Sequence, residues 1–250
     1  MTATRRISLL GGQTDAMTTS DLLDWMAEAV RSGDGGLMLS HNLHSLHLLP
    51  RSAEMRALYA QADRIQIDSM PLIAWGRLLG RPVERAHRQT YLDWREAFWS
   101  LAAREGWRIY HLGCAPGVGE AALDTIRARH PDLIAAGRDG FFAPDQAGQV
   151  LAEIRAFKPH VLLVGMGMPR QEAWTLANLP LLPGVVVAPI GGALAYEAGA
   201  VKTPPRWTGR FGLEWLWRFS TEPRRLFHRY FVEPWSLVGP ALADLRTARL

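Results

Sequence analysis

Short apolar runs alternate along the chain with stretches in which apolar residues recur every three or four positions. The runs are typical of buried β-strands, and the stretches are typical of amphipathic helices. Strands are expected on this basis at residues 7–10, 37–39, 65–67, 108–112, 133–136, 160–164 and 184–188. Helices are expected between them, for example at residues 72–79 and 91–104. The alternation predicts an α/β fold with a Rossmann-like parallel sheet flanked by helices.

The stretch from Phe157 to Trp174 gives the clearest pattern. Lys158-Pro159 ends a helix, and the apolar run that follows predicts a central strand. Gly165 and Gly167 then allow a tight turn, and Pro169 suits the first turn of the next helix. This places Arg170, Gln171 and Glu172 where open α/β sheets bind ligands. An ordinary strand-to-helix turn with a solvated polar face explains the same spacing equally well.

Polar or glycine residues follow most of the predicted strands. Because the carboxyl ends of parallel strands meet at one edge, these tips should converge on a ligand crevice. The converging tips are Asn42, Asp68, Arg85, Gly113, Gln171, Gly191 and Gly192. Locally, Asp68 fits a catalytic or ligand-binding carboxylate and the N-cap of the helix at 72–79 equally well.

The pattern breaks at Lys202-Thr203-Pro204-Pro205, which divides the chain into a core at residues 1–205 and an appendage at 206–250. Between residues 206 and 238 there are six arginines, three acids and nine aromatic residues. Such a surface suits anionic lipid, polyphosphate or nucleic acid.

Within the appendage, Thr221 is expected to cap a helix that could lie at a lipid interface. Its apolar side would carry Leu226, Phe227, Tyr230 and Phe231, and its cationic side Arg224, Arg225, His228 and Arg229. Packing of these aromatic residues on the core or on a second subunit is the alternative.

Composition and missing motifs exclude several classes of protein. The chain has 250 residues, a net charge of +4 and one cysteine, Cys114, which rules out an internal disulfide and a multi-cysteine metal site. No apolar run approaches the roughly 18 residues of a membrane-spanning helix, and no signal peptide is expected. The sequence lacks the H-E-x-x-H, P-loop, G-x-S-x-G and Asp-x-Asp patterns. The glycines from Gly113 to Gly119 do not have dinucleotide-binding spacing.

Several motifs together resemble one family. They are Gly165-Met-Gly-Met-Pro-Arg-Gln-Glu-Ala-Trp174, Asn42 after a strand, Ala62-Asp63 with Asp68, Gly140-Phe-Phe142, Gly191-Gly192 with Ala198-Gly199, and Gly212-Leu-Glu-Trp-Leu-Trp-Arg218 with Glu222-Pro-Arg224. In this order they are similar to the WecG/TagA/CpsF bacterial glycosyltransferases, from about residue 7 to about residue 234.

The resemblance implies an inverting transfer of a sugar from a UDP-sugar to a polyprenyl-diphosphate-linked sugar. The implied setting is cell-surface polysaccharide synthesis, such as exopolysaccharide, capsule or teichoic acid, by a cytoplasmic enzyme peripheral on the inner face of the plasma membrane. The implied partners are these two substrates and an anionic membrane surface, without nucleic acid; a homo-oligomer is compatible with the pattern. No cofactor and no metal site are expected.

In this resemblance Asp68 matches the general base, Asn42 a Thr-x-Asn motif, Gln171 a motif glutamine, and Arg218 and Arg225 the C-terminal arginines. A carboxylate and cations suit this chemistry, because the acceptor hydroxyl must lose a proton and the departing diphosphate needs positive charge. The further candidates for substrate binding are Ser40, Arg85, Arg88, Gly113, Glu172, Gly191, Gly192 and Arg224.

The chain departs from the family pattern around the crevice. The departures are Ser40 for threonine, Ser69 for glycine, Arg88-Gln89-Thr90 for Gly-x-Asp, Ala195 for aspartate and Thr203-Pro204-Pro205 for Arg-Ala-Pro. The resemblance therefore does not specify the donor sugar or the acceptor glycan. Two alternative functions are a nicotinamide-dependent oxidoreductase on the same kind of sheet and a non-catalytic nucleotide-sugar-binding module; the absent glycine fingerprint counts against the first.

Overall fold

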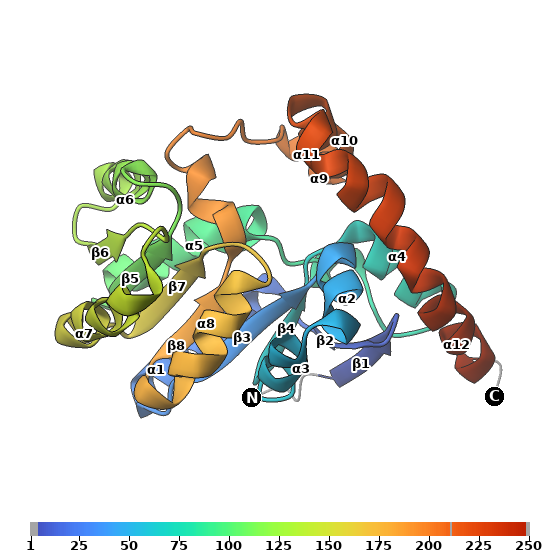
Figure 1. Cartoon of the computed structure of the whole chain (residues 1–250), viewed down its shortest axis with the longest axis horizontal. Helices are drawn as coiled ribbons and strands as arrows, with labels where there is room; N and C mark the ends of the chain where they lie inside the picture. Colours follow the sequence, from blue (N-terminus) through green and yellow to red (C-terminus); the bar gives the residue numbers. More distant parts are fainter. Residues whose placement is uncertain (1–4, 211, 249–250) are drawn as a thin grey trace.

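A six-stranded parallel sheet forms the centre of the protein, in the strand order β4-β3-β8-β7-β5-β6 (Figure 1). The computed structural model describes residues 5–210 and 212–248. The strands are β3 (Gly36–His41), β4 (Arg64–Ile67), β5 (Arg108–Gly113), β6 (Ile134–Arg138), β7 (Val161–Gly165) and β8 (Val186–Pro189). The predicted α/β class with a Rossmann-like sheet is confirmed.

Alternate strand residues point to opposite faces of the sheet, and they are apolar on both faces. Helices therefore cover both faces. On one face Met38, Ile109 and Leu163 pack against α1 (Thr19–Ser32), α5 (Tyr91–Arg104) and α6 (Val118–Arg129). On the other face Leu39, Leu162 and Val164 pack against α3 (Ala53–Tyr59), α7 (Ala147–Phe157) and α8 (Arg170–Asn178). The apolar run of β7 is buried throughout, as expected for a central strand.

The expectation that residues 7–10 form a strand of the parallel sheet is wrong. β1 (Arg5–Leu9) pairs antiparallel with β2 (Gly12–Ala16) in a separate two-stranded sheet. Leu10 and Gly11 both have positive φ, 52° and 81°, as the tight turns that join antiparallel strands require. The turn sends the chain straight back, so that residues 12–16 pair beside the first strand.

Short elements fill the connections. They are α2 (Leu43–Leu48), α4 (Met70–Leu78), the single turns η1 (Leu49–Arg51), η2 (Arg85–His87), η3 (Pro144–Gln146) and η4 (Leu179–Leu181), and the longer 3₁₀ segment η5 (Gly191–Tyr196). The loop after η2 runs beside β4, because the N–H of Gln89 donates to the carbonyl of Ile67 at 2.9 Å. This brings the polar residues at 85–90 to the carboxyl end of the sheet.

The elements from α9 to α12 form a helical arm along one side of the core (Figure 1). It consists of α9 (Arg206–Arg210), α10 (Glu214–Thr221), α11 (Pro223–Phe227), the π-helical turn η6 (His228–Val232), η7 (Glu233–Leu237) and α12 (Val238–Ala248). Asp244 attaches the end of the arm to the core, because its Oδ2 accepts hydrogen bonds from the Leu10 N–H at 2.8 Å and from Trp75 Nε1 at 2.9 Å. Leu237 completes an apolar cluster with Leu46 and Ile67.

The expected Thr221 cap is not formed. Glu222 precedes the first residue of α11, and the Thr221 hydroxyl donates backwards to the Arg218 carbonyl at 2.9 Å. The predicted apolar side is also divided: Leu226 is buried, whereas Phe227 and Phe231 are exposed. In the described part of the chain, no helix is both long enough and apolar enough to cross a membrane.

Candidate active site

Asp68 lies directly after β4, where its backbone N–H donates to the carbonyl of His41 at 2.9 Å. Ser69 occupies the N-cap position of α4, and no side chain among the described residues caps this helix. The helix-cap interpretation of Asp68 is therefore wrong. The carboxylate instead lines two adjacent cavities.

Asn42 connects this carboxylate to the neighbouring strand. It follows β3 and caps α2, because its Oδ1 accepts from the Ser45 N–H at 3.1 Å. Its Nδ2 donates to Asp68 Oδ2 at 3.3 Å. One short side chain thus starts a helix and orients the candidate base.

The two cavities, of about 490 and 530 Å³, share a wall. The first lies under the C-terminal arm and is largely apolar, with Met70, Trp215 and Phe231 in its lining. We call it the arm cavity. The second lies over the tips of β3, β7 and β8 and is more polar; we call it the tip cavity. Residues that line both are Asn42, His44, Asp68, Thr90, Glu214, Arg218 and Arg229.

Two arginines of the arm face Asp68. Arg218 and Arg229 are partly buried, and neither forms an ion pair with another residue that the structure describes. Arg218 Nε has no hydrogen-bond partner there either. Burial and the neighbouring Arg218 lower the pKa of Arg229. Unpaired guanidinium groups in a partly buried cavity favour an anionic ligand.

The pKa of Asp68 reflects this setting. Burial raises it from 3.8 to about 6, while the Asn42 hydrogen bond and the charges of Arg218, Arg88 and Arg229 oppose the rise. Near neutral pH the group is a carboxylate whose pKa is close to that of an efficient general base.

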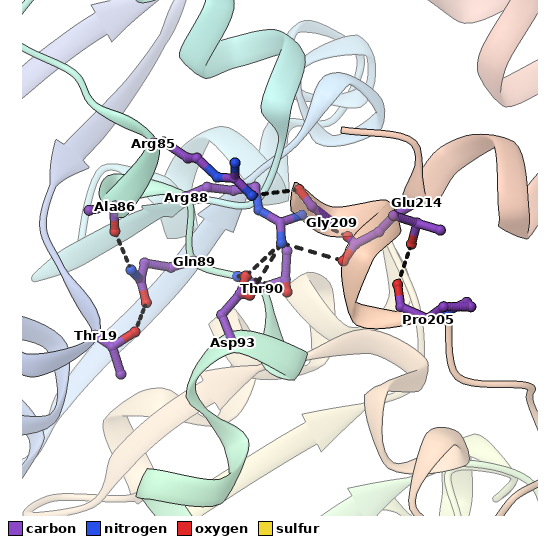
Figure 2. A network of polar contacts seen from close by, with 11 residues as sticks. Thr19, Arg85, Ala86, Arg88, Gln89, Thr90, Asp93, Pro205, Gly209 and Glu214 are labelled. Carbon is purple, nitrogen blue, oxygen red and sulfur yellow. Dashed lines mark hydrogen bonds and ion pairs between the residues drawn. The ribbon is translucent and has the colours of Figure 1, made fainter. Parts of the chain in front are cut away.

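Arg88 and Arg85 are engaged in structural contacts (Figure 2). Arg88 lines the arm cavity, but its guanidinium pairs with Asp93 at 3.0 Å and with Glu214 at 2.7 Å. Arg85 Nη2 donates to the Gly209 carbonyl at 3.2 Å and lines a third cavity beside α1. Arg85 therefore joins η2 to the arm, and Arg88 joins the loop after η2 to the arm.

Gln171 lines the tip cavity and holds its floor together. Its Oε1 accepts from the Gly191 N–H at 3.0 Å, and its Nε2 donates to Glu172 Oε1 at 2.8 Å. Glu172 is buried behind it, and burial raises the pKa of this carboxyl. Ser40, Gly191 and Gly192 also line the tip cavity.

Of the remaining candidates, one lines a cavity and two do not. Arg225 lines the tip cavity and pairs with Glu222. Arg224 is exposed and lies outside the walls of the three cavities. Gly113 also lies outside these walls: a Cβ on it would come within 2.5 Å of the Gly165 backbone, so its role is close packing of β5 on β7.

Four side chains that line both cavities are not among the candidates from the sequence: His44, Thr90, Glu214 and Arg229. The sequence pattern places Arg229 on the cationic side of a regular helix. The π-helical turn at His228–Val232 interrupts that regularity. His44 had a usable signal, because it lies two residues after Asn42 at a strand tip.

Among the described residues, no group of three or more His, Cys, Asp or Glu side chains is arranged to hold a metal ion. The model of the glycosyl transferase WecG/TagA/CpsF family matches residues 7–249, nearly the whole sequence. The protein therefore belongs to the WecG/TagA/CpsF glycosyl transferase family.

Proposed function

We propose that this transferase moves a sugar, with inversion, from a UDP-sugar to a polyprenyl-diphosphate-linked sugar during cell-surface polysaccharide synthesis. The observation that carries the proposal is the position of Asp68 in the wall shared by the two cavities, opposite Arg218 and Arg229. A transferase that joins two substrates needs its base where both of them meet. Family membership favours a transferase over the oxidoreductase alternative.

The tip cavity suits the nucleotide sugar. It combines backbone at Gly191 and Gly192, the polar side chains of Ser40 and Gln66, and the cation of Arg225. Glycines allow close approach of a ligand to the backbone, and an arginine can pair with a diphosphate.

The arm cavity suits the lipid-linked acceptor. Its lining includes Met70, Trp215, Tyr230 and Phe231, which offer aromatic surfaces for a sugar ring and apolar contact for the first prenyl units. Trp215 and Phe231 are partly exposed, at 41% and 44%, so this lining reaches the outer surface of the arm.

The reaction proposed at the shared wall is a single displacement. Asp68 accepts the proton of an acceptor hydroxyl while its oxygen bonds to the anomeric carbon. The bond between that carbon and the diphosphate oxygen breaks, and UDP leaves from the opposite face, so the anomeric configuration inverts. Arg218 and Arg229 stabilise the negative charge that develops on the leaving group.

The arm is also the proposed site of membrane contact, for an enzyme that works at the inner face of the plasma membrane. Large apolar side chains are exposed along it: Trp207 at 54%, Phe227 at 56% and Trp235 at 76%. Arg224 and Arg225 belong to the same helix as Phe227, α11, and are exposed as well. Aromatic residues interleaved with cations are typical of proteins that bind anionic bilayers.

The test is a product assay with purified protein. A panel of UDP-sugars is incubated with short-chain prenyl-diphosphate sugars, and the anomeric configuration of each product is read by NMR. Formation of a glycosidic bond with inverted configuration supports the proposal. A retained configuration would refute the single displacement, and nucleotide-sugar binding without transfer under all conditions would favour the non-catalytic module.

A further inference from the structure

His44 occupies the second position of α2 and contacts the arm across the active site. Its Nδ1 lies 2.6 Å from Oε2 of Glu233 in η7. Both side chains are largely removed from solvent, with 19% of His44 and 9% of Glu233 exposed. The pair therefore joins the core to the arm, and His44 lines the same cavity wall as Asp68.

The surroundings of His44 favour its neutral form. Burial and the nearby Arg229 and His47 lower the pKa of its imidazole, against the opposing effect of Glu233. The pKa of Glu233 is lowered by its bonds to His44 and to His228, despite partial burial. A neutral imidazole facing a carboxylate donates through Nδ1–H, which leaves a lone pair on Nε2. No partner for Nε2 is present among the described residues.

The neighbours of the pair indicate which substrate this lone pair would meet. His44 itself lines both cavities, but Leu43 and Pro234, the residues next to His44 and to Glu233, line the arm cavity and not the tip cavity. The pair thus belongs to the side proposed for the acceptor. Sugar hydroxyls are hydrogen-bond donors, and a neutral Nε2 is an acceptor.

We propose that Nε2 of His44, with the imidazole oriented by Glu233, accepts a hydrogen bond from a hydroxyl of the acceptor sugar beside Asp68. His44 is thereby a substrate-binding residue for the acceptor, and Glu233 is its positioning residue. The inference rests on the proposed function, because it assigns the acceptor sugar to the arm cavity. It also makes acceptor binding depend on the docked arm, which supplies Glu233.

A second contact between the same two elements provides a matched control. His47 Nδ1 lies 2.8 Å from Ser236 Oγ, one helical turn further along both elements. His47 lines none of the three cavities. A change at His47 therefore tests docking of the arm without a change in the cavity wall.

The kinetic experiment compares His44→Asn, His44→Gln and His47→Asn in the full-length protein, with thermal melting as a check of folding. Asparagine can keep a bond to Glu233 but lacks Nε2. We expect His44→Asn to lower kcat/KM for a short-chain prenyl-diphosphate sugar by about 10-fold to 100-fold, with the Kd for UDP unchanged. His44→Gln, whose amide reaches the Nε2 position, should recover part of this loss. His47→Asn should transfer like the wild type.

Equal acceptor kinetics for His44→Asn and the wild type would overturn the inference while leaving the proposed transferase intact. A loss that His47→Asn shares would do the same, because it would assign the effect to docking.

Histidine ¹⁵N NMR separates the inference from the proposed function, because it requires no turnover. At pH 7.5 we expect the His44 signals of the free protein to show the Nδ1–H tautomer, and Glu233→Leu to remove this preference. The prenyl-diphosphate sugar should then shift the Nε2 signal of the wild type and leave His47 unshifted. A protonated His44, an Nε2–H tautomer or an unshifted Nε2 would each refute the inference, whether or not transfer is detected.

Discussion

The carboxylate of Asp68 is positioned by Asn42 and faces two guanidinium groups, so its removal should affect chemistry more than binding. We expect Asp68→Asn to lower kcat by about 10² to 10⁴-fold, because the amide keeps the shape but cannot take a proton. Binding of UDP, measured by calorimetry, should stay within a few-fold of the wild type. Near-normal turnover by this variant would remove Asp68 from the role of general base.

The same residue should couple activity and stability to pH. Its pKa is raised from 3.8 to about 6 by burial, so the folded protein binds this proton more tightly than the unfolded chain. The stability that this group contributes is therefore fully present below pH 3.8 and is lost as the pH rises to about 6. Activity should change in the opposite direction, since kcat/KM rises as Asp68 ionises.

Asp68→Asn removes the cost of the buried charge. The free energy of unfolding should increase by about 2 to 3 kcal/mol at pH 8, and the difference should shrink toward zero near pH 4. Urea unfolding of the variant and the wild type at pH 8 and at pH 4 measures the two differences. A variant that is less stable than the wild type at pH 8 would show that the ionised carboxylate makes stabilising contacts in the fold.

Arg218 and Arg229 are expected to carry the charge of the leaving diphosphate. Alanine at either position should lower kcat by about 10² to 10³-fold, as observed when a preorganised group that stabilises transition-state charge is removed. Arg224→Ala is the matched control, because Arg224 is exposed and lies outside the cavity walls. It should transfer normally.

The arginine hypothesis also predicts that transfer persists in excess EDTA. Activity that is lost in EDTA and returns with magnesium or manganese would contradict it, even if both arginine variants are impaired.

At the scale of elements, Arg88 connects the loop after η2 to α5 and to α10 (Figure 2). Removing Arg88 takes this cation away from the carboxylates of Asp93 and Glu214, which are poorly solvated because their side chains are only 18% and 17% exposed. We expect Arg88→Met to lower the free energy of unfolding by about 3 kcal/mol. In a double-mutant cycle with Glu214→Gln the two effects should not add. Additive effects would show that the ion pair with Glu214 does not hold the arm.

Most elements of the core could be predicted from the sequence, because a parallel sheet buried on both faces requires continuous apolar strands. His160 to Val164 and Gly184 to Ala188 show this pattern, and β7 and β8 lie there. The hairpin of β1 and β2 could not be predicted from the same pattern. Gln13, Thr14 and Asp15 in β2 are polar, and Asp15 is buried only because Arg6 and the Ile65 N–H pair with it.

The residues of the site that follow strands could be predicted from the sequence. Those that the arm contributes could not. Asn42, Asp68, Gln171 and the glycines at 191 and 192 all follow strands, and the fold brings them to one edge. Arg229 and Glu233 reach this edge through a π-helical turn and a change of helix type, and no side-chain periodicity reports such a change.

At the scale of the whole molecule, the arm combines an outward apolar surface with an inward catalytic wall. Phe227→Ser together with Trp235→Ser should weaken sedimentation with anionic vesicles several-fold, because both side chains are more than half exposed. Transfer to a short-chain, water-soluble acceptor should be kept, since neither residue lines a described cavity.

Phe141→Ser is the control for the vesicle experiment. Phe141 is 68% exposed and belongs to the α/β part of the chain, at residues 1–205, and not to the arm. It should sediment like the wild type. If the arm variant also sediments unchanged, membrane contact must be assigned to another surface, and the exposed aromatic residues of the arm become candidates for contact with a second copy of the chain.

The close packing of glycines at the strand tips determines which positions are useful for redesigning sugar preference. A Cβ on Gly165 would come within 2.7 Å of the Gly191 carbonyl oxygen and 2.9 Å of His111 Nε2, so even alanine would displace the floor of the tip cavity. By contrast, Ser69 and Thr90 line the cavities from loops, and Ala195 lines the tip cavity from the 3₁₀ segment η5. A combinatorial library at these three positions would sample new substrate contacts while leaving the strand tips intact.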